Sequence, residues 1–304
     1  MSCNQPTPSD ARRRNKKRAR LAKIRPDALQ GRVILKQFRV NSRLARGGMS
    51  SVYLVRDVKS GELLAAKVLR SDLVLEFRVR ERFLNESRAI QRIDHPAVVR
   101  VRSVGELDDD RLCLVMEYVH GSSLRKVLRN GPISPANAVA IIGSVSEGLA
   151  AAHEQCIIHR DLKPENVLVP QKSSGALAKL VDFGIARIID APRITTTQHV
   201  MGTPQYIAPE QAMGKAVDHR ADIYAIGVMM YEMLTGDLPF DGNDPETLLR
   251  HHISTPPPPI VEHESDKGIP EDLKYLVMRC LSKAPANRPA NMDEVLSLLA
   301  RVHV

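Results

Sequence analysis

Two polar motifs in the middle of the chain carry the oxygen-bearing side chains that a Mg²⁺ site needs. HRDLKPEN at residues 159–166 lies between two apolar runs that predict strands, Cys156–Ile158 and Val167–Val169, and DFG at 182–184 follows a third, Lys179–Val181. The second and third runs predict an antiparallel hairpin, in which the start of one strand lies beside the end of the other, so Asn166 and Asp182 should be neighbours. Their amide and carboxylate oxygens, with Asp161 close by, suit Mg²⁺, which keeps its other positions for water and phosphate oxygens.

A second candidate is the turn LARGGMSSV at residues 44–52, which lies between two predicted strands. Backbone N–H groups of such a glycine-containing turn can approach phosphates closely, although an ordinary β-hairpin would use the same residues. Lys67 lies fifteen residues after Val52, at the end of an apolar strand. An ammonium there can reach anionic oxygens beneath the turn, which favours the phosphate-binding interpretation.

The helix predicted after this strand has one apolar stripe, and Glu86 falls on it. The stripe consists of Val79, Phe83, Ile90 and Ile93. A carboxylate that faces a core needs a partner, because burial without one is costly, and Lys67 is the candidate cation. The alternative is that Glu86 lies at the edge of the stripe and reaches water.

The elements that must position these residues fall into two parts. From about Phe38 to Ile93 the chain reads as strands rich in Val and Leu followed by one helix, which predicts a small and mostly antiparallel lobe. After a strand at 112–117 the pattern becomes helical. We therefore expect an N-lobe over about 34–117 and a larger helical C-lobe over about 120–304, in one domain of residues 34–304.

Helices of the larger lobe are marked by capping residues and apolar runs. Ser134 and Pro135 predict a helix start, and residues 221–234 are apolar on nearly every side, so that helix should be buried and end at Gly236. Further helices are predicted near 271–283 and 292–302.

Net charge is concentrated at one end of the chain. Residues 1–30 hold nine basic and two acidic residues, so +7 of the formal +9 lies there and the remaining 274 residues carry 35 basic against 33 acidic residues. We expect residues 1–33 to be a disordered basic arm. A solvated tail is one interpretation, and contact with an acidic protein, nucleic acid or anionic lipid is the other.

Cysteine and hydropathy patterns indicate the compartment. The four cysteines are far apart without a C-x-x-C pair, so neither a zinc site nor a disulfide framework is predicted. No apolar run is long enough to span a membrane, and no apolar segment follows the basic N-terminus as in a signal peptide. We expect a cytoplasmic protein without a transmembrane segment.

Taken together, the motifs resemble the eukaryotic-type (Hanks-type) Ser/Thr protein kinases, most closely those of bacteria. The resemblance runs from about Phe38 to the C-terminus. It rests on GGMS, VMEYV, HRDLKPEN, DFGIAR and GTPQYIAPEQ in this order. It implies an α+β, two-lobed kinase fold and transfer of the γ-phosphoryl group of ATP to serine or threonine of protein substrates.

The resemblance also implies an ATP site. Val52 and Ala65 would cover the adenine from above and Leu168 from below, with Met116 as gatekeeper, and Lys67, oriented by Glu86, would hold the phosphates. The first glycine of the family pattern is Ala45 here, whose methyl would be strained if that position needed a positive φ. The full implied set is Leu44, Ala45, Arg46, Gly47, Gly48, Met49, Ser50, Ser51, Val52, Ala65, Lys67, Glu86, Met116, Glu117, Val119 and Leu168.

Catalytic roles are implied for the matching positions in the second half of the chain. Asp161 would accept the proton of the substrate hydroxyl, and Lys163 would neutralise charge on the transferred group. Asn166 and Asp182 would hold Mg²⁺, with Mn²⁺ as an alternative ion. Thr203, together with Lys163, favours serine and threonine over tyrosine as acceptors.

Structural and regulatory roles follow from the same resemblance. Glu210 and Arg288 would form an ion pair that anchors the activation segment, which runs from DFG to APE at residues 182–210, and Asp222 would brace the catalytic loop HRDLKPEN at residues 159–166. Autophosphorylation of Thr195 and Thr197 would order that segment through Arg160; the alternative is a polar loop without a switch.

Three other functions fit the sequence less well than a protein kinase does. A pseudokinase scaffold is disfavoured because Lys67, Glu86, Asp161, Asn166 and Asp182 are all present. A small-molecule phosphotransferase would not need GTPQYIAPE, which the resemblance implies is a segment that docks the protein substrate. A nucleic-acid-binding protein is disfavoured because the body of the chain is almost neutral.

Overall fold

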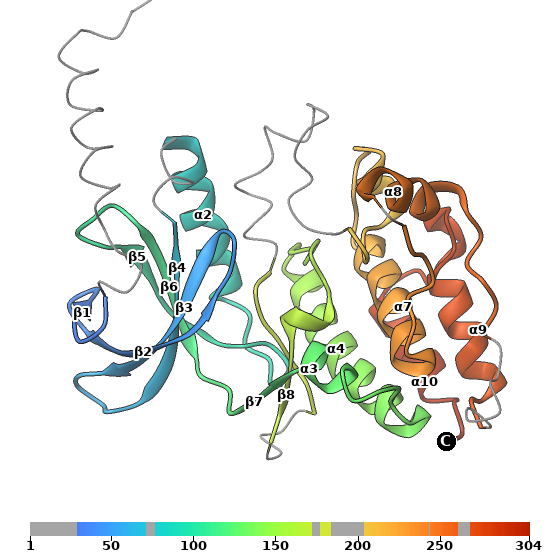
Figure 1. The fold of residues 1–304 in the computed structure, drawn as a ribbon, viewed down its shortest axis with the longest axis horizontal. Helices are drawn as coiled ribbons and strands as arrows, with labels where there is room; N and C mark the ends of the chain where they lie inside the picture. Colours follow the sequence, from blue (N-terminus) through green and yellow to red (C-terminus); the bar gives the residue numbers. More distant parts are fainter. Residues whose placement is uncertain (1–28, 71–76, 172–176, 184–203, 243, 261–267) are drawn as a thin grey trace, which may run out of the picture. The chain divides into compact units, whose positions relative to one another are not determined.

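The computed structural model describes residues 29–70, 77–171, 177–183, 204–242, 244–260 and 268–304, without the side chains of 77–79 and 82. The described residues form two compact units (Figure 1). The first is drawn from Met1–Leu84 and Val101–Tyr118, and the second from Asn85–Arg100 and Val119–Val304. Residues 85–100, expected on the N-lobe side, thus group with the second unit.

The first unit is built on a six-stranded antiparallel sheet. Its strands in spatial order are β1 (Val33–Ile34), β2 (Phe38–Arg46), β3 (Ser50–Asp57), β4 (Leu63–Leu69), β6 (Leu112–Glu117) and β5 (Val101–Glu106). Period-two alternation sends one set of side chains into a core that includes Phe38, Tyr53, Val55 and Val115. Helix α2 (Phe77–Ile90) follows β4.

Order in this unit begins earlier than residue 34. Leu29 is only 3% exposed and belongs to the hydrophobic core of the sheet. Gly31, with a φ of 80°, donates its N–H to Val40 O at 2.8 Å. One leucine and one glycine turn create no periodic pattern, which is why the sequence assigned residues 29–33 to the arm. Residues 1–28 of that arm lie outside the described residues.

The second unit combines a small sheet with helices. The sheet has the order β7 (Gly121–Ser123), β8 (Val167–Pro170), β9 (Lys179–Leu180). Its helices are α3 (Leu124–Leu128), α4 (Pro135–Glu154), α6 (Pro209–Ala212), α7 (Arg220–Thr235), α8 (Pro245–Ser254), α9 (Glu271–Cys280) and α10 (Met292–Leu299), with the 3₁₀ turns η2 (Pro164–Asn166) and η3 (Pro285–Asn287).

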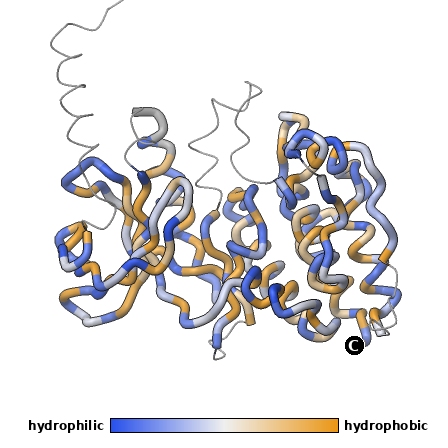
Figure 2. Tube along the Cα trace, viewed as in Figure 1, coloured by the Kyte–Doolittle hydropathy of each residue, from blue (hydrophilic) through white to orange (hydrophobic). Residues whose placement is uncertain are grey.

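Helix α7 lies at the centre of this unit, as its sequence predicts. Every residue from Ala221 to Leu234 is buried, and the helix ends at Gly236, whose φ of 82° is left-handed. Helices α4 and α9 both pack against α7, and hydrophobic stretches are visible along the helices of this unit in Figure 2. At the start of α4, Ser134 caps the helix by accepting the N–H of Asn137.

One predicted strand is absent. Cys156–Ile158 was expected to be a strand leading into the HRD motif, but these residues form no assigned strand. Cys156 has a φ of 57°, and Ile157 donates its N–H to Ala152 O at 3.0 Å, so the segment closes the C-terminal end of α4. The apolar, β-branched residues Ile157 and Ile158 are typical of a strand, but in the structure the segment forms the end of the preceding helix instead.

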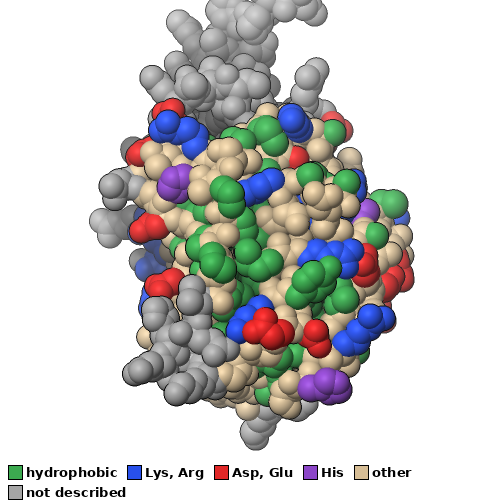
Figure 3. Space-filling view, turned by 90° about the vertical axis from the view of Figure 1, so that its right-hand side faces the viewer, with side chains coloured by type: hydrophobic (Ala, Val, Ile, Leu, Met, Phe, Trp, Pro, Cys, Tyr) green, Lys and Arg blue, Asp and Glu red, His purple; other side chains and the backbone are tan. Residues whose placement is uncertain are grey.

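The described surface of the helical unit carries charged and apolar side chains together. On the face of the helical unit in Figure 3, acidic and basic side chains are interspersed with apolar ones. Among the described residues, no helix is long and apolar enough to cross a membrane.

The packing of α7 against α9 leads to a stability prediction. A Cβ added at Gly227 would lie 2.8 Å from Cys280 Cβ and 3.2 Å from Leu281 Cγ, whereas one at Gly143 in α4 would meet nothing within 4 Å. We expect Gly227→Ala to lower the free energy of unfolding by about 1–3 kcal/mol because the site is overpacked. Gly143→Ala should raise it by up to about 1 kcal/mol. Urea unfolding of both variants tests this, and equal effects would contradict it.

Candidate active site

One face of the sheet in the first unit gathers the predicted nucleotide-binding residues. Val52 lies directly opposite Lys67, and Ala65 directly opposite Met116. Cross-strand partners and residues two apart share a face, so these four side chains lie on the same side of the sheet. The residues that alternate with them along the same strands belong to the core on the other side. The spacing of these residues in the sequence does not show that they share a face, whereas the pairing register of the strands does.

The glycine turn is held at its tip by Arg70. The guanidinium of Arg70 donates to Gly48 O at 3.0 Å, and its backbone N–H donates to Met49 O at 2.9 Å. Within the turn, Gly47 donates its N–H to Ser50 O at 2.8 Å. Ala45 pairs with Val52 in the sheet and is not among the described residues with positive φ. The backbone strain considered for Ala45 is therefore absent, because the residue lies in an ordinary extended strand.

Glu86 does not face the core as predicted. Phe83 and Ile90 of the same helix are 1% and 6% exposed, whereas Glu86 is an exposed residue. Its position at the edge of the apolar stripe was the alternative interpretation, and it is the one that the structure supports. Helical spacing alone places a residue on a stripe only to within about one position. The side chain of Val79 lies outside the description.

The two proposed metal ligands are neighbours, as the hairpin predicts. Val167 pairs with Leu180, and Val181 donates its N–H to Asn166 O at 2.9 Å, which brings Asp182 beside Asn166. Asp182 has a left-handed φ of 59°. The Asn166 side-chain amide donates to Asp161 O at 2.7 Å, so its nitrogen is fixed by the loop and its oxygen is the atom suited to a cation.

The catalytic loop brings Asp161 and Lys163 together. Lys163 Nζ donates to Asp161 Oδ2 at 2.8 Å, and Asn166 Nδ2 approaches the same oxygen at 3.3 Å. The Asn166 N–H also donates to Lys163 O at 2.9 Å and closes the turn. Both side chains of the ion pair are about one-third exposed, at 36% for Lys163 and 31% for Asp161. The pair is therefore fixed by the loop and partly exposed to solvent.

Asp222 holds this loop from below. Its carboxylate accepts the backbone N–H groups of His159 at 2.8 Å and Arg160 at 2.9 Å, and His153 Nε2 at 2.8 Å. Burial by itself would raise the pKa of Asp222, but the hydrogen bonds from His153 and the backbone lower it below its ordinary value. The carboxylate is thus a fixed negative charge, and the predicted contact with the catalytic loop is present.

His159 connects the loop to the DFG segment, a link that the sequence did not predict. Its side chain is fully buried, its Nε2 lies 3.1 Å from Val181 O, and its ring packs on Phe183 with centroids 4.8 Å apart. Burial lowers the pKa of His159, so the imidazole is neutral. Because a carbonyl can only accept, Nε2 must carry the proton. His159 belongs to the HRD motif, but the motif does not indicate its contacts with Val181 and Phe183.

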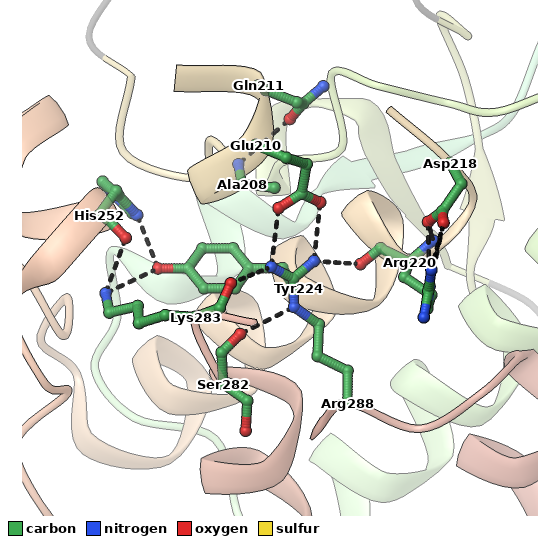
Figure 4. Close-up of polar contacts among 10 residues, drawn as sticks. All are labelled: Ala208, Glu210, Gln211, Asp218, Arg220, Tyr224, His252, Ser282, Lys283 and Arg288. Carbon is green, nitrogen blue, oxygen red and sulfur yellow. Dashed lines mark hydrogen bonds and ion pairs between the residues drawn. The ribbon is translucent and has the colours of Figure 1, made fainter. Parts of the chain in front are cut away.

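The predicted Glu210–Arg288 ion pair is present and fully enclosed (Figure 4). Arg288 donates to both Glu210 oxygens at 2.8 Å, to Arg220 O and Ser282 O at 2.8 Å, and to Lys283 O at 3.0 Å. These five bonds use all five N–H groups of a guanidinium. A buried arginine satisfied in this way fixes α6 to the start of α7 and to the segment before η3.

Lys283 forms a second group of contacts beside this pair, and Figure 4 draws it with His252 and Tyr224. Lys283 Nζ donates to His251 O and His252 O at 2.9 Å, at the C-terminal end of α8, and lies 4.0 Å from the Phe240 ring centroid. His252 Nδ1 contacts Tyr224 OH at 3.0 Å. Burial, helped by the charge of Lys283, lowers the pKa of His252 to about 3. No sequence pattern signalled this cluster.

Several predicted residues cannot be placed. Thr195, Thr197 and Thr203 lie outside the described residues.

The other predicted residues are placed. Arg160 is exposed and has a φ of 62°, and its carbonyl oxygen accepts a hydrogen bond from Gln211 Nε2 at 3.2 Å. Leu168 is half-buried in β8. Glu117 is the last residue of β6 in the first unit, and Val119 is the first residue of the longer segment of the second unit.

Comparison with known proteins identifies the family. A family model described as protein kinase domain matches residues 38–298. Serine/threonine-protein kinase pkn2 of Myxococcus xanthus is 43% identical over 288 residues, which cover 92% of this chain and 34% of that protein. Serine/threonine-protein kinase PknB of Mycobacterium tuberculosis is 39% identical over 274 residues, covering 88% and 43%. The chain belongs to the protein kinase family and, within it, to the Hanks-type Ser/Thr kinases that are most similar to those of bacteria.

Solved structures agree with this assignment. A crystal structure of the Mycobacterium tuberculosis PknI kinase domain matches with a TM-score of 0.70 at 26% identity, over 89% of this chain and 96% of that one. The fold is therefore the α+β protein kinase fold, and members of this family use ATP and a divalent metal ion. The chain spans a third to a half of the length of the curated relatives that it matches.

The enclosed ion pair gives a matched pair of variants. Arg288→Met would leave Glu210 buried without its partner, so we expect a loss of about 3–5 kcal/mol in the free energy of unfolding. Arg220 forms an ion pair with Asp218 in which the side chains are 32% and 46% exposed. Arg220→Met should cost less than about 1 kcal/mol. Chemical denaturation measures both, and a small effect at Arg288 would contradict the assignment.

His252 makes stability depend on pH. Its pKa is about 3 in the folded protein and 6.5 as an ordinary histidine, so below pH 6.5 the unfolded chain binds a proton that the folded chain does not. Stability should fall as pH drops from 6.5 towards 3, by at most about 1.4 kcal/mol per pH unit from this group. The difference in unfolding free energy between the unsubstituted protein and His252→Asn, measured at pH 7.5 and at pH 5, isolates the contribution, and a difference independent of pH would contradict it.

Proposed function

We propose that this chain is an active Ser/Thr protein kinase that transfers the γ-phosphoryl group of ATP to serine or threonine hydroxyls of proteins. The observation that supports it best is the intact catalytic loop, in which Asp161, Lys163 and Asn166 contact one another at 2.7–3.3 Å. A pseudokinase would have no need to keep this arrangement together with Lys67 and Asp182. We therefore favour catalysis over a scaffolding role.

Asp161 is proposed as the group that positions the acceptor hydroxyl and takes its proton. Lys163 and Asn166 both donate to its Oδ2, so Oδ1 is the oxygen suited to the hydroxyl. Lys163 is proposed to neutralise charge on the transferred phosphoryl group, because its ammonium is already fixed beside that carboxylate. Phosphoryl transfer needs such positioning and charge neutralisation more than covalent help.

Asn166 and Asp182 are proposed to hold the divalent ion, with Mg²⁺ favoured over Mn²⁺. The donor set fits, since both offer hard oxygens and their backbones are joined by the hairpin. When bound, the ion neutralises charge on the phosphates of ATP. Lys67 and the turn at residues 44–52 are proposed to bind those phosphates, while Val52, Ala65 and Met116, on the same face of the sheet as Lys67, would contact the adenine.

Regulation, location and partners complete the proposal. Autophosphorylation of Thr195 and Thr197 is proposed to order the activation segment through Arg160, whose exposed side chain is available for a phosphate. Cys113, Cys156 and Cys280 are free thiols, which suits a cytoplasmic location. Residues 1–28 lie outside the described residues, so a contact of the basic arm with acidic partners stays a sequence-based suggestion.

Phosphate transfer from labelled ATP in the presence of Mg²⁺ tests the proposal. Asp161→Ala removes the proposed base, and we expect phosphorylation to fall by about 10²- to 10⁴-fold. Asp94→Ala, which removes an exposed carboxylate paired with Arg100, is the control and should keep full activity. Mass spectrometry then maps the modified serines and threonines. Absence of any Asp161-dependent phosphate on these residues would refute the kinase proposal.

A further inference from the structure

The loop that carries the proposed base turns sharply at the residue before it. Asp161 donates its N–H to His159 O at 2.8 Å, and Arg160 between them has a φ of 62°. A hydrogen bond to the second residue back, around a residue with positive φ, defines the rarer and strained form of the γ-turn. The direction in which Asp161 leaves the turn depends on the backbone of Arg160, so the contacts that hold this backbone also place the proposed base.

Two side chains from different helices hold the backbone of Arg160. Its N–H is bound by Asp222 of α7 at 2.9 Å, and its carbonyl oxygen accepts a hydrogen bond from Gln211 Nε2 of α6 at 3.2 Å. That carbonyl belongs to the peptide bond between Arg160 and Asp161. Because a peptide bond is planar, a contact with its oxygen restrains the whole link to Asp161. Asp222 thus fixes the entry to the turn, and Gln211 fixes its exit.

The two ends of the Gln211 amide can be assigned from their partners. Its Oε1 accepts the backbone N–H of Ala208 at 3.1 Å, a bond drawn in Figure 4. A backbone N–H can only donate, so the oxygen of the amide must face Ala208. The NH₂ group therefore faces Arg160, where a carbonyl oxygen is the acceptor that it needs. Both ends of this half-buried side chain thus have a defined partner.

Helix α6 gives Gln211 a rigid support. Glu210, the residue before it, is 5% exposed and is paired with the enclosed Arg288. The same short helix begins within APE, at the end of the segment that starts at DFG. Gln211 therefore connects the anchored end of that segment to the turn before Asp161.

We infer that Gln211 is a positioning residue for the proposed base Asp161, acting through the carbonyl group of Arg160. The donor on Gln211 keeps the peptide bond between Arg160 and Asp161 in one orientation. The carboxylate of Asp161 is then held where an acceptor hydroxyl can give up its proton. The inference rests on the proposed kinase function and adds a residue to which the sequence motifs gave no role.

Single-turnover phosphate transfer from ATP, with Mg²⁺ present and a peptide copied from a mapped phosphosite, measures the effect on the chemical step. Gln211→Glu keeps an oxygen for Ala208 but has no N–H for Arg160, and Gln211→Met lacks both groups. We expect both variants to lower the transfer rate by about 10- to 100-fold, because a small displacement of a reacting group has an effect of this size. The KM values for ATP and for the peptide should stay within about 2-fold.

The two variants differ in the bond to Ala208, which separates positioning from structural support. Urea unfolding should give a lower midpoint for Gln211→Met than for the unsubstituted protein, and an unchanged midpoint for Gln211→Glu. A slower transfer in Gln211→Met alone would mean that the side chain only stabilises α6. A slower transfer in Gln211→Glu alone would mean that the new negative charge is responsible. Either result would overturn the inference, as would full rates in both variants or a raised peptide KM at an unchanged rate.

Gln155→Glu is the matched control. Gln155 is an exposed residue at the end of α4 in the same unit. The same chemical change there should leave the transfer rate within about 2-fold. A fall as large as that of Gln211→Glu would show that an added charge is enough to slow the reaction, and would overturn the inference. Absence of phosphate transfer by the unsubstituted protein would instead refute the kinase proposal, whereas a loss confined to the Gln211 variants leaves that proposal intact.

Discussion

The carboxylate of Asp222 is the interaction on which the conformation of the catalytic loop depends. Arg160 has a left-handed φ of 62°, which is unfavourable for a residue with a side chain. Its N–H is bound by Asp222, as is that of His159, so the charge of a buried group holds the strained backbone in place. Asp182 is also left-handed, and His159 contacts the carbonyl of the residue before it. Strain at Arg160 and Asp182 is therefore opposed by contacts that lead to Asp222 of helix α7.

Two arginines perform related tasks in the helical unit with different exposure. Arg288 is enclosed, and all of its donors are bound by Glu210 and by carbonyls. Arg125 joins Glu165, Tyr206 and Glu232 across comparable separations, but its side chain is 23% exposed. Burial makes Arg288 a fixed structural element, since nothing outside can compete for its partners. Arg125 pairs with Glu165, whose side chain is 46% exposed, so solvent can compete for this contact. Similar chemistry thus joins distant segments in both places, with solvent excluded in one and admitted in the other.

Local patterns predicted the elements and the motifs predicted the residues, but contacts between distant segments needed the structure. The register of β8 and β9 follows from a short hairpin, so the neighbourhood of Asn166 and Asp182 could be predicted from the sequence. Glu86 was misplaced because helical periodicity defines a stripe less sharply than packing does. His159, His252 and Arg125 depend on partners up to 107 residues away, and no local pattern carries that information. Leu29 was missed because one buried leucine has no period.

The assignment of residues 85–100 to the second unit determines the order in which the protein can be completed during synthesis. Ala97 and Val99 form backbone hydrogen bonds with Leu180, at 2.7 and 2.9 Å. A nascent chain that has released the whole of the first sheet, up to Tyr118, therefore still carries an internal segment whose partners have yet to be made. Val98, which is buried and forms a β-bridge with Leu180, lacks this partner until the ribosome has passed Leu180. Closing a contact of this range is slow, and this interval is when a chaperone would find its binding site.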